Sequence, residues 1–123
     1  MSRRVSAKIC GITTLRDAQL ATAVGADAIG FIFAAGSPRR VTPAAAARIV
    51  HQLPEEIVPV GVFVNASADE MNAVAAQVGL GAVQLHGDET PELLDALVPP
   101  VVKAVGRVDA ETAIRWPARV RLV

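Results

Sequence analysis

The residues of this chain that could transfer protons stand where apolar runs end. The single cysteine, Cys10, lies between Ile9 and Gly11, and Lys8 precedes it by two positions. A cysteine acts as a base or a nucleophile when its neighbours favour the thiolate, and a nearby lysine or helix end can do this. A lone cysteine at the end of a strand is more often a small buried hydrophobic residue. Cys10 is therefore a candidate base that needs support from other residues.

Polar residues also close two later apolar runs. Gln84 and His86 are two positions apart at the end of one run, and Asn65 ends an earlier one. Because alternate residues of a strand point to the same face, Gln84 and His86 share a face. A single histidine is more often structural, and a buried glutamine must find partners in any fold, so neither is a strong signal alone. Taken together, Cys10, Asn65 and His86 predict a site at the carboxyl ends of parallel strands, where such sheets bind ligands.

Four charged residues near the same strand ends have ordinary explanations and one functional alternative. Arg39 and Arg40 follow a Gly-Ser-Pro turn and would normally be solvated, but a guanidinium there could reach over the strand ends to an anionic ligand. Asp88 and Glu89 precede the Thr-Pro pair at 90–91, so interaction with the start of a helix is the default explanation for both. We assign neither carboxylate a catalytic role.

These residues must be positioned by an alternation of strands and helices. Apolar, β-branched runs are followed by segments with apolar residues at helical spacing, the pattern of parallel β-α-β units. The predicted strands lie near residues 5–10, 27–33, 57–64, 82–86, 100–104 and 119–123. Most of the intervening helices carry recognisable start and stop signals. The predicted amino-terminal caps are Thr14, Thr42, Ser67, Thr90 and Asp109, the last helix ends near Trp116-Pro117, and Gly25 and Gly79 follow the first and third helices.

The alternation fits two architectures, an open doubly wound sheet and a (β/α)8 barrel. The sequence offers five complete βα units and a sixth strand, whereas a full barrel needs about 200 residues or more. No G-x-G-x-x-G follows the first strand, as a dinucleotide-binding sheet would require. Periodicity alone leaves the two architectures open. No linker or low-complexity stretch divides residues 1–123, so we expect a single domain.

Composition narrows the class of protein. The 123 residues are 52% hydrophobic, which suits strands buried on both faces. Twelve basic and twelve acidic residues give a formal net charge of zero, and this argues against binding to nucleic acid. No apolar segment is long enough for a signal peptide or a membrane span, so we expect a cytoplasmic protein. One cysteine excludes an internal disulfide, and His51 and His86 show no metal-ligand spacing.

Taken as an ordered set, the motifs are more specific than any single one. The chain resembles phosphoribosylanthranilate isomerase, a (β/α)8 TIM-barrel enzyme of tryptophan biosynthesis, and this resemblance favours the barrel over the open sheet. The segments that carry it are K-I-C-G-I-T at 8–13, G-A-D-A-I-G-F-I-F at 25–33, S-P-R at 37–39, V-G-V-F-V-N at 60–65 and V-Q-L-H-G-D-E at 83–89.

The resemblance implies a reaction and roles for four residues. Members of the family convert N-(5-phosphoribosyl)anthranilate to 1-(2-carboxyphenylamino)-1-deoxyribulose 5-phosphate by an Amadori rearrangement, without cofactor or metal. The resemblance implies that Cys10 is the general base, as a thiolate. It also implies that Arg39 contacts the anthranilate part of this small-molecule substrate, and that Gln84 and His86 line the pocket.

The sequence also departs from the family. The family's general acid is an aspartate at the end of the sixth strand, and its phosphate is held by the loops after strands seven and eight. Here the sixth predicted strand, 119–123, is the last segment of the sequence. We therefore expect the amino-terminal three-fifths of an isomerase, truncated within its barrel and inactive by itself. Strands left unpaired at the two edges would favour self-association.

Two alternatives remain open at this level. The chain could be a non-catalytic half-barrel that serves as a binding or assembly module. It could also be a different phosphosugar enzyme on the same scaffold, because a fold does not fix a function. The cysteine-glycine junction and the Gln-Leu-His-Gly segment argue against the second alternative.

Overall fold

The computed structural model describes residues 7–104, 116–117 and 120–122 of the chain. In this part, six parallel strands form one sheet whose spatial order follows the sequence, from β1 to β6. The strands are β1 (Lys8–Cys10), β2 (Ala28–Ile32), β3 (Val58–Phe63), β4 (Ala82–Leu85), β5 (Val101–Lys103) and β6 (Arg121–Leu122). A doubly wound sheet reverses its strand order at a switch point, whereas a barrel does not. The sequential order therefore favours the barrel architecture.

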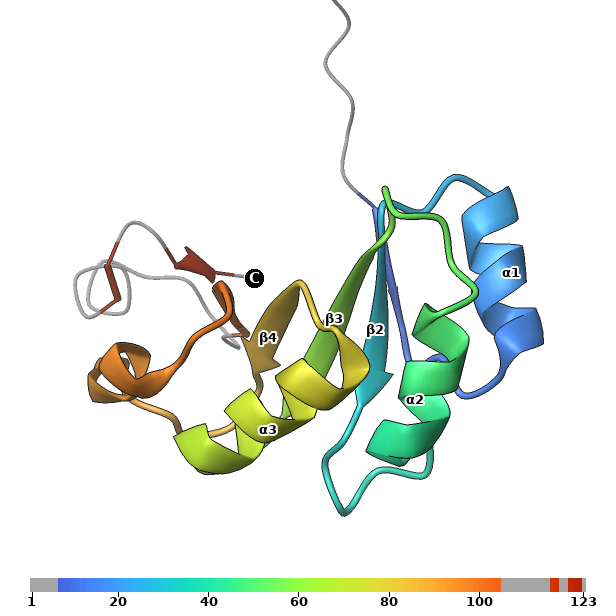
Figure 1. The fold of residues 1–123 in the computed structure, drawn as a ribbon. Helices are drawn as coiled ribbons and strands as arrows, with labels where there is room; N and C mark the ends of the chain where they lie inside the picture. Colours follow the sequence, from blue (N-terminus) through green and yellow to red (C-terminus); the bar gives the residue numbers. More distant parts are fainter. Residues whose placement is uncertain (1–6, 105–115, 118–119, 123) are drawn as a thin grey trace, which may run out of the picture.

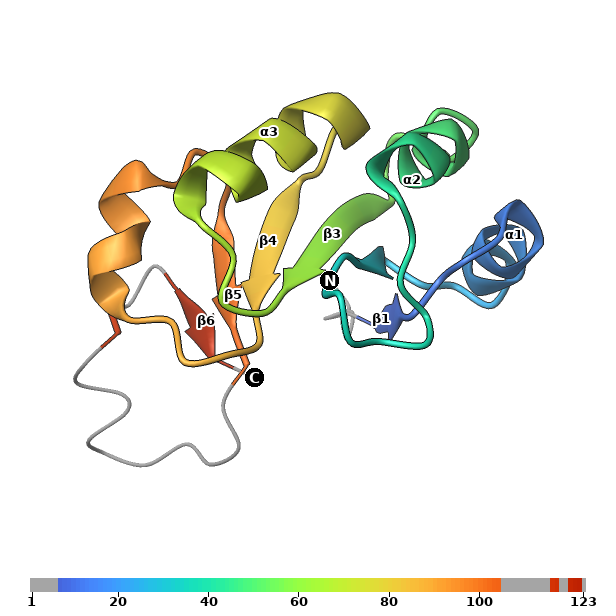
Figure 2. The ribbon, with the colours of Figure 1, turned by 90° about the horizontal axis from the view of Figure 1, so that it is seen from below.

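The helices cover only the outer side of this sheet, which curves as part of a barrel does (Figure 1, Figure 2). They are α1 (Leu15–Ala23), α2 (Pro43–Val50), α3 (Ala68–Val78) and the short 3-10 helix η1 (Pro91–Ala96). Each lies between consecutive strands, as in βα units. Every predicted strand is thus confirmed, with bounds that differ by a few residues.

Three of the predicted helix starts are confirmed by side-chain hydrogen bonds. Thr14 Oγ1 accepts from the Asp17 N–H at 3.1 Å, and Thr42 Oγ1 accepts from the Ala45 N–H at 3.2 Å. Ser67 Oγ caps α3 in the same way. The chain leaves α3 through Gly79, whose φ of +84° is the left-handed conformation that favours glycine. These caps satisfy backbone donors that a helix end leaves unpaired.

The prediction of a capped α-helix after Thr90 is wrong. The Thr90 hydroxyl makes no capping hydrogen bond, and the segment forms the short helix η1. Two prolines, Pro99 and Pro100, force the residues before them into extended conformations and leave little room for a longer helix. Asn72 of α3 holds the end of η1, with its Nδ2 2.7 Å from the Ala96 carbonyl oxygen. The helix predicted to start at Asp109 lies outside the described residues.

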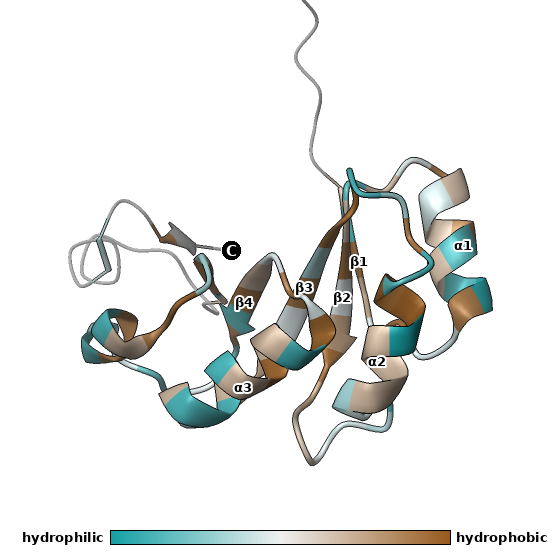
Figure 3. Cartoon of the chain, in the orientation of Figure 1, coloured by the Kyte–Doolittle hydropathy of each residue, from teal (hydrophilic) through white to brown (hydrophobic). Residues whose placement is uncertain are grey.

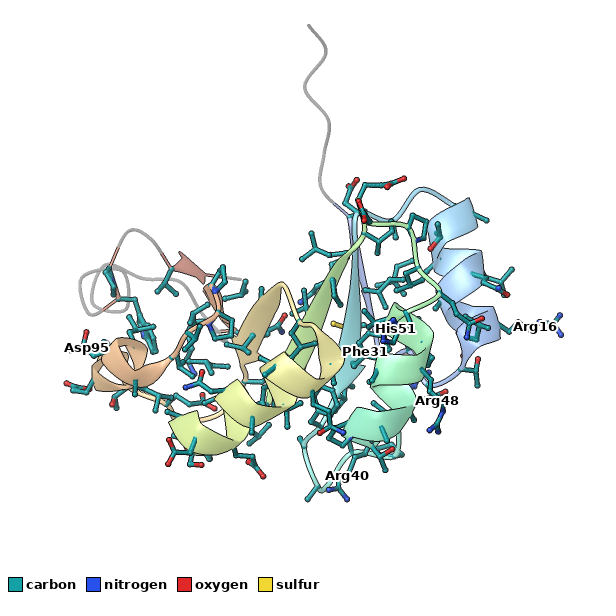
Figure 4. The ribbon with its side chains drawn as sticks, in the orientation of Figure 1. Arg16, Phe31, Arg40, Arg48, His51 and Asp95 are labelled. Carbon is teal, nitrogen blue, oxygen red and sulfur yellow. The ribbon has the colours of Figure 1, made fainter. Side chains whose placement is uncertain are left out.

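The core divides into two hydrophobic clusters between the sheet and the helices. One joins β2 to α1 and α2 around Ile29 and Phe31, and Figure 4 shows Phe31 between β2 and α2. The other joins β4 to α3 and η1 around Val83, Leu85 and Met71. Figure 3 shows the hydrophobic residues along β2 and polar residues on the outer turns of α1 and α3. Odd-numbered positions of β2 and β4 thus face the helices, and the even-numbered ones face the inner side.

No helix in the described part of the chain is long and apolar enough to span a membrane.

Candidate active site

A pocket of about 570 Å³ opens on the inner side of the sheet at the carboxyl ends of the strands. It is lined by Cys10 from β1, Ile32 from β2, Val62 and Val64 from or just after β3, Gln84 and His86 from or just after β4, and residues 34–37 of the loop after β2. The strand register explains why residues from different strands line one pocket, because Ile32 pairs with Val62 and Val62 pairs with Gln84. The structure thus brings together three of the four predicted site residues, Cys10, Gln84 and His86.

Cys10 is the last residue of β1 and is exposed to the pocket rather than buried as a core residue. Its partner on β2 is Gly30, and a Cβ there would lie only 2.6 Å from Cys10 Sγ. Glycine at position 30 therefore makes the space that the thiol occupies. The next turn is fixed because the backbone N–H groups of Gly11 and Ile12 both donate to the Gly30 carbonyl, at 3.0 and 3.2 Å. The thiol therefore projects from a well-defined backbone.

Arg39 lies beside Cys10 but outside the first pocket. Its side chain crosses the backbone of Gly11, where a Cβ would be 2.9 Å from Arg39 Cδ. Arg39 instead lines a second pocket of about 580 Å³ between β1 and α1, and Cys10 lines both. The neighbouring Arg40 points away from the sheet (Figure 4). Of the two arginines, Arg39 is therefore the one placed to reach an anionic group near the thiol.

Gln84 and His86 differ in exposure. Gln84 lies within β4 and is 6% exposed, and its Oε1 has no hydrogen-bond partner in the described part of the chain. The His86 side chain is exposed at the rim, and its backbone N–H donates to the Phe63 carbonyl at 2.9 Å. The pocket thus offers a thiol, an imidazole and an unpaired amide oxygen against an otherwise mainly apolar wall.

Asn65, a predicted strand-end residue, has a structural role. It adopts a φ of +53°, and its Oδ1 accepts from the Asp88 N–H at 2.8 Å. Its side chain lies against Gly87, where a Cβ would be 2.7 Å from Asn65 Oδ1. Asn65 therefore joins the end of β3 to the loop after β4 and does not line the pocket with Cys10.

Glu89 belongs to a buried ion pair that sequence reasoning missed. Lys103 Nζ lies 2.9 Å from Glu89 Oε1 and donates to the Gly87 carbonyl at 2.6 Å. Glu89 also accepts from the backbone N–H groups of Gly87 and Asn65. The interpretation of Glu89 as a helix-start charge is therefore wrong, because its carboxylate turns back to the strand ends. The available signal for Lys103 was its position as the one charged residue within the apolar run 100–104.

The ion pair lies on the helix side of the sheet. Lys103 pairs in register with Leu85, which packs in the second core cluster, and its Nζ is 5.7 Å from the centre of the Trp116 ring. Burial raises the pKa of Glu89, but the hydrogen bonds from Lys103 and from the backbone N–H groups outweigh it, so the pKa lies below its usual value. Glu89 is thus held ionised and cannot serve as a general acid near neutral pH.

No three His, Cys, Asp or Glu side chains of the described residues gather where they could hold a metal ion.

A family model matches most of the chain. The model of N-(5′-phosphoribosyl)anthranilate isomerase matches residues 7–117. The chain belongs to this family.

Curated relatives and solved structures support the assignment. The chain is 52% identical to the isomerase of Citrifermentans bemidjiense over 97 residues, which is 79% of this chain and 47% of that protein. It is 45% identical to the isomerase of Herminiimonas arsenicoxydans over 117 residues, 92% of this chain and 51% of that protein. The crystal structure of the Thermus thermophilus isomerase superposes with a TM-score of 0.87 at 40% identity, over 96% of this chain and 62% of that one.

A further crystal structure superposes with a TM-score of 0.86 at 41% identity, over 97% of this chain and 64% of that one. That isomerase is in complex with reduced 1-(o-carboxyphenylamino)-1-deoxyribulose 5-phosphate. These comparisons confirm the predicted family and the TIM-barrel type of fold, of which the described residues form a part. The chain spans about half the length of the curated relatives that it matches.

Proposed function

We propose that this chain supplies the general base and one wall of the substrate pocket of a phosphoribosylanthranilate isomerase, in the cytoplasmic synthesis of tryptophan. The observation that carries the proposal is the meeting of Cys10, Gln84 and His86 in one pocket, with Arg39 beside the thiol. Because the chain spans about half of its curated relatives, we assign the whole reaction to a polypeptide that also contains the counterpart of their other half.

The reaction requires one acid and one base. An acid protonates the ribose ring oxygen and opens the ring to an iminium, and a base then removes the proton from C2 of that iminium. Each well-placed proton-transfer group contributes about 10²- to 10⁴-fold to the rate. In this proposal the base is the Cys10 thiolate, which the space at Gly30 leaves accessible. Arg39 holds the anthranilate carboxylate through its guanidinium fork.

We assign the general acid to none of the described carboxylates. Glu89 is engaged by Lys103 on the helix side of the sheet, and neither Asp88 nor Glu89 lines the pocket that holds Cys10, Gln84 and His86. The family resemblance assigns the acid to an aspartate that follows the sixth strand, and β6 ends at Leu122. The acid therefore belongs, in this proposal, to the part of the barrel that corresponds to the relatives' other half.

A chimera tests the proposal directly. The chain is continued after β6 with the carboxyl-terminal portion of the Thermus thermophilus isomerase, and turnover of N-(5-phosphoribosyl)anthranilate is measured. We expect turnover by the chimera, a loss of about 100-fold or more in Cys10→Ala, and none by the 123-residue chain alone. A folded chimera that turns over equally well with alanine at position 10 would refute the assignment of the base.

The alternative of an assembly module is favoured by one surface. All residues of β1 are exposed, and Ile9, Leu20 and Val24 are 37%, 56% and 76% exposed around the second pocket. An unpaired strand edge beside apolar side chains is a site for association. We propose that the 123-residue chain self-associates through β1 and α1. Sedimentation should show dimers or larger species that Leu20→Glu dissociates, and a wild-type monomer at about 0.1 mM would refute this.

A further inference from the structure

Gln84 carries a polar group that the protein itself leaves unsatisfied. It is 6% exposed, and its Oε1 is buried without a partner among the described residues. Its neighbours in register are the apolar residues Val62 on β3 and Val102 on β5. A buried acceptor without a donor destabilises the folded state, so native proteins retain few of them. An apolar side chain of similar length would pack against these valines without leaving an unpaired acceptor. The amide therefore does not serve stability, and this points to a functional role.

The position of the amide restricts what that use can be. Gln84 lines the same pocket as Cys10, on the inner side of the sheet. Its oxygen accepts hydrogen bonds and cannot donate them, so it has no attraction for an ionised carboxylate or phosphate, which are acceptors. It suits a hydroxyl or an N–H group, and most of the remaining pocket wall is apolar. A ligand should therefore bring a donor to this point.

We propose that Gln84 is a specificity-determining residue whose amide oxygen accepts a hydrogen bond from the part of the ligand that reacts. This inference rests on the proposed function, in which Cys10 acts at C2. The groups beside C2 are the anthranilate N–H and the sugar hydroxyls, and both are donors. The carboxylate and the phosphate at the two ends of the ligand are left to cationic or backbone partners. The amide thus selects for an uncharged donor in the middle of the ligand.

Two substitutions separate this role from a structural one. Gln84→Met has similar length and no strong acceptor, so it removes both the unpaired oxygen and the proposed hydrogen bond. Gln77→Met makes the same chemical change on the exposed side of α3 and is the matched control. If the inference is correct, Gln84→Met weakens ligand binding and raises the melting temperature of the free chain by a few degrees, whereas Gln77→Met changes neither.

The ligand for the test is reduced 1-(o-carboxyphenylamino)-1-deoxyribulose 5-phosphate, titrated calorimetrically into the chimera described above, with and without each substitution. We expect Gln84→Met to raise the dissociation constant about tenfold, equivalent to 1.4 kcal/mol. An ether analogue with oxygen in place of the nitrogen identifies the donor. If the N–H group is the donor, Gln84→Met weakens binding of the amine ligand but not of the ether analogue. If a sugar hydroxyl is the donor, Gln84→Met weakens binding of both ligands.

The outcomes distinguish this inference from the proposed function. Binding by the wild-type chimera with equal affinity in Gln84→Met, within twofold, overturns the inference and leaves the proposed function standing. Failure of the wild-type chimera to bind either ligand at millimolar concentration overturns the inference together with the proposed function. If Gln84→Met does not fold, Gln84→Asn takes its place, because it keeps the amide but withdraws the oxygen by one methylene, and the same loss of affinity is expected.

Discussion

Removal of Lys103 should strongly destabilise the fold. The Glu89 side chain is only 2% exposed and that of Lys103 is 7% exposed, so the ion pair is almost fully removed from water. Replacing Lys103 with methionine keeps most of the length of the side chain, but it removes the ammonium group near the Trp116 ring and leaves the Glu89 carboxylate without its counter-ion. The Gly87 carbonyl also loses the donor that lies 2.6 Å from it. Both losses fall on the loop that carries His86.

The expected magnitude follows from burial. Removing one partner of a buried pair costs about 3–5 kcal/mol, because the remaining charge has no compensation. A domain of this size has a free energy of unfolding of about 5–15 kcal/mol, so Lys103→Met should remove a large part of it. Lys8, on the exposed strand β1, gives the matched control. Lys8→Met should stay within about 0.5 kcal/mol of the wild type.

The effect should depend on pH in a defined direction. The pKa of Glu89 is lowered in the folded protein, so its contribution to stability is present above the usual value of a glutamate and is lost as pH falls through the folded value. Without Lys103 the raising effect of burial has less opposition, and the Glu89 pKa rises. In the variant, Glu89 then takes up a proton and loses its uncompensated charge at a pH where Glu89 of the wild type is still ionised. The difference in stability between wild type and Lys103→Met should therefore shrink between pH 7 and pH 4.

Urea unfolding at both pH values, followed by circular dichroism, measures this difference. A Lys103→Met variant within 1 kcal/mol of the wild type at pH 7 would show that the pair contributes little. A large difference that stays the same at pH 4 would show that lost packing, rather than the uncompensated carboxylate, is responsible. Glu89→Gln provides the complementary measurement, since it keeps the size and removes the charge.

Two further predictions concern the positioning of the thiol and the helix caps. Gly30→Ala should destabilise the chain by about 1–3 kcal/mol and slow the labelling of Cys10 by a disulfide reagent, because the new methyl group would lie 2.6 Å from Sγ; Gly36→Ala, with open space at its Cβ, should do neither. Thr42→Ala should lower the free energy of unfolding by about 1 kcal/mol, since it removes a cap of α2, whereas Thr90→Ala should have almost no effect. Equal losses for Thr42→Ala and Thr90→Ala would contradict the second prediction.

The fold and most of the pocket could be predicted because they depend on local sequence and on strand parity. Cys10 ends β1, and Gln84 and His86 lie at the end of β4 at positions that face the same side, so parallel register brings them to one rim. The family resemblance decided for the barrel, and the sequential strand order agrees with it. The short helix η1 was harder to predict, because Thr90-Pro91 is a valid helix start and the prolines beyond it limit the length.

The ion pair of Lys103 could not be found in the same way, because it depends on a loop that returns to a strand end. Alternation places Lys103 on the helix side, where a lysine would normally extend to solvent along its aliphatic stem. Only the turn at Gly87, fixed by Asn65 and by Glu89 itself, brings a carboxylate over that position. The same turn determines where His86 leaves β4. The inner face of the sheet thus carries the candidate site, and a charged contact on the outer face fixes the loop that bears His86.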